Sequence, residues 1–373
     1  MTLKRLFIQN LRNLNSVDIQ PSDRVNLIYG ENGSGKTSIL EAINVLALGR
    51  SFRSHKHKPL ISNGEDSFTV FGKVVDDNEA EIPVGVDRKM DGTASFKANG
   101  NVIASAAILA NYLPVQVINS DTFLLLEGSP KVRRQFIDWL VFHVEPNFFT
   151  AWKDCQRCLK HRNSLLRRDR IDGFELAPWD QELVLLTERI HGFRHSCMEL
   201  FKTTFYQLLK EFISIDGISI SYYRGWDKDK SYREVLESSL ERDSQQGYTN
   251  IGTHRADLRI TVNGQNAAEV LSRGQQKLLV CALKIAQGLV FSQLSHRKTI
   301  YLVDDLPAEL DEKHRGLLAH WLHTMATQVF ITGVEQETLV STWRNKPNVT
   351  VKLFHVEQGI VKAVDESSAI GTE

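Results

Sequence analysis

The stretch GENGSGKT at residues 30–37 is the feature that most constrains the fold of this 373-residue chain. Two glycines enclose four residues and are followed by Lys36 and Thr37, which is the spacing of a phosphate-binding loop. The apolar run VNLIY precedes the stretch, and SILEAINVLAL, with apolar residues at helical spacing, follows it. A strand, a glycine-rich loop and a helix in this order predict an α/β fold that binds phosphate at the N-terminus of the helix.

Each residue type in this loop suits a bound triphosphate. Gly30, Gly33 and Gly35 allow backbone N–H groups to turn inward where a side chain would clash. The Lys36 ammonium can reach the β- and γ-phosphates of ATP, and the Thr37 hydroxyl can bind Mg²⁺. The alternative is an ordinary glycine turn before a helix with a surface lysine. The expected nucleotide-binding residues are Gly30, Glu31, Asn32, Gly33, Ser34, Gly35, Lys36, Thr37 and Ser38.

Composition is that of an ordinary globular protein and leaves the partner open. Lys plus Arg and Asp plus Glu both number 45, so net charge neither favours nor excludes an anionic partner. Four cysteines are too few for a disulfide framework, and the CxxC of Cys155 and Cys158 favours packing on one helix face over a metal site. Because no run has the length of a signal sequence or membrane span, we expect a cytoplasmic protein with no membrane partner.

The periodicity of the chain changes twice along its length. Residues 1–113 combine strand-like runs around one helix, with hairpin signals at Asp91-Gly92 and Asn99-Gly100. Residues 114–248 carry long stretches of helical spacing, and α/β character returns over residues 249–373. We therefore expect an α/β head built from the first and last segments, with the middle segment inserted as a helical arm.

A strand that ends in two carboxylates supplies the second part of a nucleotide site. TIYLVDD at residues 299–305 is an apolar run that ends at Asp304 and Asp305. Asp304 is placed to bind Mg²⁺ together with Thr37, and Asp305 is placed to orient an attacking water molecule. The alternative for the two acids is the solvated start of a loop.

A third motif, LSRGQQK at residues 271–277, lies before this strand and opens a helical run. Ser272 and Gly274 at a helix start can offer a hydroxyl, backbone N–H groups and the helix dipole to another phosphate. Taken alone, the motif is equally an ordinary helix N-cap.

The order of these motifs, followed by ELDEKH at residues 309–314, resembles the ABC-type ATPase head of the branch that contains SMC and Rad50 proteins. A narrower resemblance is to the RecF family of bacterial DNA replication and repair proteins. It extends over most of the chain and is weakest at 66–105 and 205–248. It implies a P-loop head with a mixed sheet, an antiparallel β subdomain and an inserted helical arm. The segments that carry it are LFIQNLRNL, LALGRSFRS, EGSPKVRRQFID, GTHRADL, LSRGQQK and DDLPAELDEKHR.

The resemblance assigns roles within one subunit and across a dimer. Lys36 and Asp305 would be catalytic, while Thr37 and Asp304 would hold Mg²⁺. Residues of the partner subunit would close over the ATP held by the first subunit. Those acting across this interface would be Ser272, Gly274, Gln275 and Asp311.

Two departures from the wider ABC pattern predict slow hydrolysis. The second acid, Asp305, is one methylene shorter than the usual glutamate. The strand QVFIT is followed by Gly333 instead of histidine, which leaves Thr332 as the nearest polar candidate. The glutamine-loop equivalent stays open between Gln116 and Asn119, with a preference for Asn119.

The resemblance further implies a weak, DNA-stimulated ATPase of homologous recombination and the SOS response to DNA damage. An ATP-dependent homodimer would clamp double-stranded DNA near single-strand gaps, and RecR and RecO would be its partners in loading RecA. Two alternatives of other classes are a P-loop kinase that acts on a small metabolite and a nucleotide-gated scaffold without turnover. ATP-dependent dimers that need Ser272 would favour the head over the kinase.

Two basic segments are candidate contacts to the DNA backbone. GRSFRSHKHK at residues 49–58 has no acid, and KDCQRCLKHRNSLLRRDR at residues 153–170 holds seven Lys or Arg against two Asp. Such charge suits phosphates without reading sequence, although a basic helix face is often simply solvated. The expected DNA-binding residues are Arg50, Arg53, Lys56, Arg162, Arg167 and Arg168.

Overall fold

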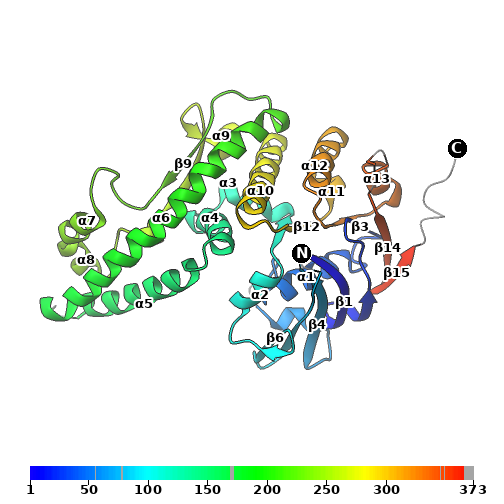
Figure 1. The fold of residues 1–373 in the computed structure, drawn as a ribbon, viewed down its shortest axis with the longest axis horizontal. Coiled ribbons are helices and arrows are strands. Elements are labelled where there is room, and N and C mark those ends of the chain that lie inside the picture. Colours follow the sequence, from blue (N-terminus) through cyan, green and yellow to red (C-terminus); the bar gives the residue numbers. More distant parts are fainter. Residues whose placement is uncertain (55, 77–78, 169–171, 345, 348, 365–373) are drawn as a thin grey trace. The chain divides into compact units, whose positions relative to one another are not determined.

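The computed structural model describes residues 1–373 except 55, 77–78, 169–171, 345, 348 and 365–373 (Figure 1). The described chain forms two compact units. The first consists of Met1–Thr122 and Leu283–Glu373, and the second consists of Phe123–Ala282.

Both borders lie away from the expected ones at 113/114 and 248/249. The segment after residue 113 forms β8 (Val115–Ile118), which pairs in parallel with β12 (Ile300–Val303) of the first unit. The segment after residue 248 forms β10 (Asp257–Val262), which pairs with β9 (Ile218–Tyr223) of the second unit. Strand pairing, which periodicity alone does not reveal, therefore sets the borders.

A mixed sheet in the first unit carries the phosphate loop. Its strand order is β15-β14-β3-β13-β12-β8, in which β15 is antiparallel to β14 and the other neighbours are parallel. All four residues of β12 are buried, as expected for a parallel strand covered on both faces. The further strands are β3 (Val25–Tyr29), β13 (Val329–Gly333), β14 (Val351–Glu357) and β15 (Ile360–Val364).

An antiparallel sheet forms the second layer of this unit, in the order β2-β1-β4-β5-β6-β7. Asp91-Gly92 and Asn99-Gly100 lie in its β5–β6 and β6–β7 turns, as the sequence predicts. The strands are β1 (Thr2–Leu11), β2 (Leu14–Ile19), β4 (Ser67–Val75), β5 (Glu81–Lys89), β6 (Ala94–Ala98) and β7 (Asn101–Val102).

Helix α1 (Lys36–Leu48) belongs to the core shared by the two sheets. Nearly all of its residues are buried, which is the pattern of a helix enclosed on every side. Ile39, Ile43 and Leu46 belong to one apolar cluster with residues of β1 and β13, so the helix that follows the phosphate loop is fixed rigidly. The other α-helices that lie wholly within the described part of this unit are α2 (Ala106–Tyr112), α11 (Leu306–Glu309), α12 (Glu312–Thr324) and α13 (Gln336–Ser341).

The second unit is mainly helical, as expected for the arm. Its longest elements, α5 (Phe148–Leu166) and α6 (Gly173–Phe212), pack side by side (Figure 1). The remaining elements are α3 (Leu124–Glu127), α4 (Pro130–Val144), α7 (Tyr232–Ser238), α8 (Leu240–Gln246), α9 (Ala267–Val270) and β11 (Gln265–Asn266), which pairs with β10.

All four cysteines of the chain are buried as free thiols. Burial raises the pKa of Cys158 and of Cys197 to about 12 and also raises the pKa of Cys155. Cys155 and Cys158 face the interior from α5, in keeping with a packing role for the CxxC.

Arg162 is buried in the arm, which corrects its expected role in DNA binding. Its side chain has no exposed surface. Nε donates to Asp180 (2.6 Å), and one terminal nitrogen donates to Asp243 (2.8 Å) and to Thr249 (2.7 Å). Asp243 is equally buried, so the guanidinium neutralises an interior carboxylate and cannot reach a DNA phosphate.

Two motifs that resemble the RecF family meet inside the second unit. Arg133 donates to both carboxylate oxygens of Asp257 (2.7 and 3.1 Å), and Arg134 donates to the carbonyl of Ala256 (2.8 Å). Arg194 of α6 donates to the carbonyl of Thr253 (2.8 Å). EGSPKVRR and GTHRADL thus have a structural role, because arginines of the first motif and Arg194 of α6 bind residues of the second motif.

Helix α10 (Arg273–Ser295) begins at LSRGQQK and has the length and composition of a membrane span. Two thirds of its most apolar part, 67%, is buried inside the protein. A core helix passes the same test of composition, and burial accounts for the apolar residues here.

We predict that Arg162→Met lowers the free energy of unfolding by about 3–5 kcal/mol, because Asp243 is left buried without its partner. The matched control is Arg157→Met on the same helix, where Arg157 is 66% exposed and pairs with Asp154 near the surface. This control should change stability by less than about 1 kcal/mol. Urea denaturation followed by tryptophan fluorescence measures both. Equal losses for the two variants would contradict a structural role for Arg162.

Candidate nucleotide site

The phosphate loop runs from the end of β3 to the start of α1 and needs its glycines. Gly30, Gly33 and Gly35 have φ values of 150°, 80° and 121°, a region that residues with side chains rarely adopt. A Cβ at Gly30 would lie 2.1 Å from the carbonyl oxygen of Val356 in β14. The close approach of loop and strand explains why glycine stands there.

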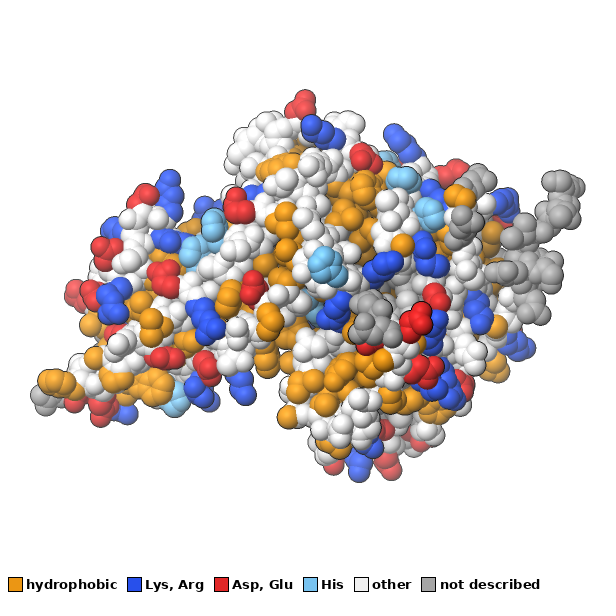
Figure 2. All heavy atoms as spheres, in the orientation of Figure 1, with side chains coloured by type: hydrophobic (Ala, Val, Ile, Leu, Met, Phe, Trp, Pro, Cys, Tyr) orange, Lys and Arg blue, Asp and Glu red, His pale blue; other side chains and the backbone are white. Residues whose placement is uncertain are grey.

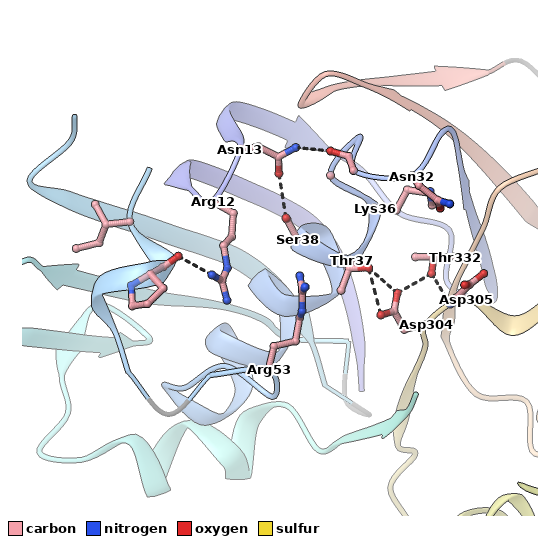
Figure 3. A pocket seen from close by; sticks show the side chains of 14 residues that line it. Arg12, Asn13, Asn32, Lys36, Thr37, Ser38, Arg53, Asp304, Asp305 and Thr332 are labelled. Carbon is pink, nitrogen blue, oxygen red and sulfur yellow. Dashed lines mark hydrogen bonds between the residues drawn. The ribbon is translucent and has the colours of Figure 1, made fainter. Parts of the chain in front are cut away.

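Asn13, in the turn between β1 and β2, holds the loop from outside. Its side-chain amide donates to the carbonyls of Gly33 (3.2 Å) and Ser34 (3.0 Å). Its carbonyl accepts from the hydroxyl of Ser38 (3.0 Å; Figure 3). Asn13 was not among the expected site residues. It belongs to a turn of the antiparallel sheet and the phosphate loop follows a strand of the mixed sheet, so the two meet only because the sheets pack together.

Lys36 is directed into the loop. Its ammonium donates to the carbonyls of Gly30 (2.7 Å) and Glu31 (2.8 Å), and the residue is 8% exposed. Burial lowers the pKa of Lys36, and the charges of Asp305 and Asp304 oppose that shift. A desolvated cation inside a glycine-rich loop suits a multiply charged anion.

The two acids after β12 lie beside the phosphate loop. The hydroxyl of Thr37 is 2.9 and 3.1 Å from the two carboxylate oxygens of Asp304. The hydroxyl of Thr332, in β13, donates to Asp304 (2.8 Å) and accepts the backbone N–H of Asp305 (2.7 Å; Figure 3). A hydroxyl and a carboxylate at this separation provide the oxygen ligands that Mg²⁺ prefers.

Asp305 has an unusual backbone conformation. Its φ and ψ are 51° and 52°, which is the left-handed region. This conformation costs a residue with a side chain about 1–2 kcal/mol, although aspartate tolerates it better than most residues. The hydrogen bond to Thr332 helps to hold it.

A cavity of about 510 Å³ joins these groups (Figure 3). Two arginines, Arg12 and Arg53, stand on its wall. Arg12 donates twice to the buried carboxylate of Glu41 (2.8 Å each), and this bonding raises the pKa of Arg12. The hydroxyl of Ser51 donates to the same carboxylate. The residues that line the cavity are Arg12, Asn13, Asn32, Gly33, Gly35, Lys36, Thr37, Ser38, Arg53, Pro59, Ile61, Asp304, Asp305 and Thr332.

Ser51 connects Glu41 to the basic segment at residues 49–58. Its oxygen accepts the backbone N–H groups of Arg53 and Ser54 (2.9 Å each). One buried carboxylate thereby positions both Arg12 and the start of the loop that carries Arg53. We expected Arg53 at DNA, whereas its position favours contact with a ligand in the cavity.

The two glutamine-loop candidates have other partners in the structure. Gln116 is buried in β8, where its amide donates to Gln287 and its carbonyl accepts from Lys284 (2.9 Å) of α10. The carbonyl of the Asn119 side chain accepts from the hydroxyl of Thr122 (3.0 Å). Gln116 is therefore directed toward α10.

The residues expected to act across a dimer occupy two helix starts. Ser272 and Gln275 form a reciprocal cap at the start of α10, and Ser272 and Gly274 are exposed. Asp311 is the N-cap of α12 and accepts from the backbone N–H of His314 (3.0 Å), which lowers the pKa of Asp311. Ser272 belongs to the second unit, and the phosphate loop belongs to the first.

Comparison with known proteins places the chain in a family. The RecF/RecN/SMC N-terminal domain model matches residues 2–362. The DNA replication and repair protein RecF of Cellvibrio japonicus is 68% identical over 361 residues, covering 97% of this chain and 99% of that protein. RecF of Pseudomonas aeruginosa is 48% identical over the full length of both chains, 373 residues.

Solved structures agree with this assignment. The recombination mediator protein RecF with ATP, of the RecFOR pathway, has a TM-score of 0.85 and 27% identity, covering 98% of both chains. An SMC head bound to the C-terminal winged-helix domain of ScpA has a TM-score of 0.58 at 16% identity over 98% of this chain, which bears on the fold alone. The expected ABC-type ATPase head with a mixed sheet and a helical insertion is confirmed, and the chain belongs to the RecF family of the RecF/RecN/SMC proteins.

Proposed function

We propose that this protein is an ATP-dependent DNA-binding protein of recombinational repair and a slow ATPase. ATP would pair two heads into a clamp on double-stranded DNA near single-strand gaps, and hydrolysis would open it. The hydrogen bond between Thr37 of the phosphate loop and Asp304 of β12 carries the proposal, because it joins the phosphate and acidic motifs in one cavity. The relatives named for DNA replication and repair and a similar structure that contains ATP support it.

The chain's own residues supply most of the chemistry of this site. Backbone N–H groups of the loop and the Lys36 ammonium would bind the phosphates, and Thr37 with Asp304 would hold Mg²⁺. The metal ion would neutralise phosphate charge when bound. Asp305, half-buried next to Asp304, would orient the attacking water. Arg12 and Arg53 would face the nucleotide from the cavity wall.

The exposed start of α10 would complete the site of a partner subunit. Ser272 and Gly274 would offer a hydroxyl and N–H groups to the γ-phosphate held by the other head, with Gln275 fixing the cap. Asp311 would cross the same interface. RecR and RecO would be partners in loading RecA in the cytoplasm, and the RecFOR pathway named for the similar structure supports this.

Of the basic residues expected at DNA, Arg162 is buried in the arm and Arg53 lines the cavity. DNA contacts would come from the other, exposed ones. These are Arg50, Lys56, Arg167 and Arg168; Arg170 lies outside the described residues. Positive and negative side chains are intermingled on the face drawn in Figure 2. Binding would thus depend on a few local cations and would fall steeply with salt.

We predict that Lys36→Ala and Ser272→Arg proteins each fail to dimerise with ATP, whereas their equimolar mixture forms heterodimers. Each pocket would take Lys36 from one subunit and Ser272 from the other. In a mixed dimer one pocket therefore contains both substitutions and the other pocket contains neither. Size-exclusion chromatography coupled to light scattering measures this, with ADP as the control nucleotide.

Other results would change the assignment. A mixture that stays monomeric while wild-type dimerises would place lysine and serine in one subunit and refute the composite pocket. A wild-type monomer that transfers phosphate to a metabolite would indicate a kinase. A wild-type dimer that releases no phosphate would indicate a scaffold.

A second prediction concerns DNA. Reversing the charge of Arg50 and Lys56 to glutamate should weaken duplex binding and lower the slope of log K against log salt by about 0.9 per lost phosphate contact. ATP affinity should stay unchanged. Fluorescence anisotropy across a salt series is the measurement, and the control is reversal of the exposed Lys97 and Lys298. Identical slopes for the two double variants would exclude the basic segment as a DNA contact.

A further inference from the structure

We propose that Thr332 is a positioning residue for ATP hydrolysis that fixes Asp304 and Asp305 relative to each other. The inference rests on the proposed ATPase function. Thr332 stands at the end of β13, before Gly333, where the chain lacks the histidine of many ABC heads.

The hydroxyl of Thr332 is engaged on both sides by the acid pair. It donates to a carboxylate oxygen of Asp304 (2.8 Å) and accepts the N–H of Asp305 (2.7 Å). A threonine hydroxyl has one hydrogen to donate, and that hydrogen is used at Asp304. With 1% of its surface exposed, Thr332 therefore acts on the acids and does not itself take the place of a phosphate-binding histidine.

The contact matters because of the backbone of Asp305. A residue with φ of 51° and ψ of 52° returns readily to ordinary extended or right-handed conformations unless a neighbour holds it. Such a return would redirect the carboxylate of Asp305 away from the cavity that it lines. Thr332, on the adjacent strand β13, accepts the N–H of Asp305. The pairing of β12 with β13 therefore sets the direction of the Asp305 side chain.

The same hydroxyl limits the rotation of Asp304. Asp304 accepts from Thr37 on one side and from Thr332 on the other. The carboxylate is thereby presented in one orientation beside the phosphate loop. Loss of the Thr332 hydroxyl would affect both acids at once, although neither is altered chemically.

The kinetic test compares Thr332→Val, which removes the hydroxyl at nearly constant shape, with Thr332→Ser, which keeps it. Single-turnover hydrolysis at saturating ATP should fall about 10- to 100-fold in the valine variant and return to within about 3-fold of wild-type in the serine variant. ATP affinity should change less than about 2-fold. Adding Thr332→Val to Asp305→Asn should cause a smaller further loss than Thr332→Val causes alone, because part of the threonine's effect passes through Asp305 and the rest through Asp304.

A second readout does not depend on activity. Amide hydrogen exchange of Asp305, followed by NMR or mass spectrometry without nucleotide, should be at least about 10-fold faster in Thr332→Val than in wild-type. The control is Thr342→Val, where the lost hydroxyl donates to the carbonyl of Thr338 in α13 (3.2 Å) and not to an acid. It should leave exchange at Asp305 and the hydrolysis rate unchanged.

Each result decides between the two proposals. Unchanged exchange at Asp305 in Thr332→Val, or losses that multiply in the double variant, would overturn the positioning role. A wild-type protein that binds ATP without hydrolysing it would instead overturn the ATPase proposal. In that case faster exchange in Thr332→Val would still support the hold on Asp305.

Discussion

The carboxylate of Asp304 accepts hydroxyl hydrogen bonds from two segments far apart in the sequence. Thr37 lies in the first turn of the helix after the phosphate loop, and Thr332 is the last residue but one of a strand almost 300 residues later. Parallel strands place their carboxyl ends at one edge of the sheet, which brings the three residues together. The loop, the acids and the proposed metal site all depend on this meeting point, because a slip in strand register would separate them.

A fully buried carboxylate, that of Glu41, organises the other side of the cavity. Glu41, in the middle of α1, binds Arg12 of the turn between β1 and β2 and Ser51 of the basic segment at residues 49–58. The segment that begins after α1 is thus anchored to the helix that follows the phosphate loop. A bound anion that attracts Arg53 would pull on the same segment that carries Arg50 and Lys56. The fold therefore provides a short covalent and hydrogen-bonded route from nucleotide to the proposed DNA contacts.

The motifs were predictable from sequence because their chemistry is local, whereas partners across sheets were not. The phosphate loop and the acidic strand end are contiguous patterns, and the structure joins them as expected. Asn13 lies in LFIQNLRNL, one of the segments that carry the family resemblance, but neither Asn13 nor Glu41 has a local chemical pattern that reveals its role, since their partners come from other elements. The burial of Arg162 did have a signal: Cys155, Cys158 and Leu165 mark a buried stripe at helical spacing, and Arg162 falls on it. Charge counting over the whole run ignored that stripe.

The burial of the native cysteines has a practical consequence for spectroscopy. The thiolate is the reactive species toward maleimides, and burial holds the pKa of three of these thiols above the usual value. All four side chains are also shielded by packing. A single surface cysteine introduced into each unit would therefore take up fluorophores selectively in the otherwise unaltered chain. Energy transfer between the two dyes would then test whether the distance between the two units changes when ATP is added.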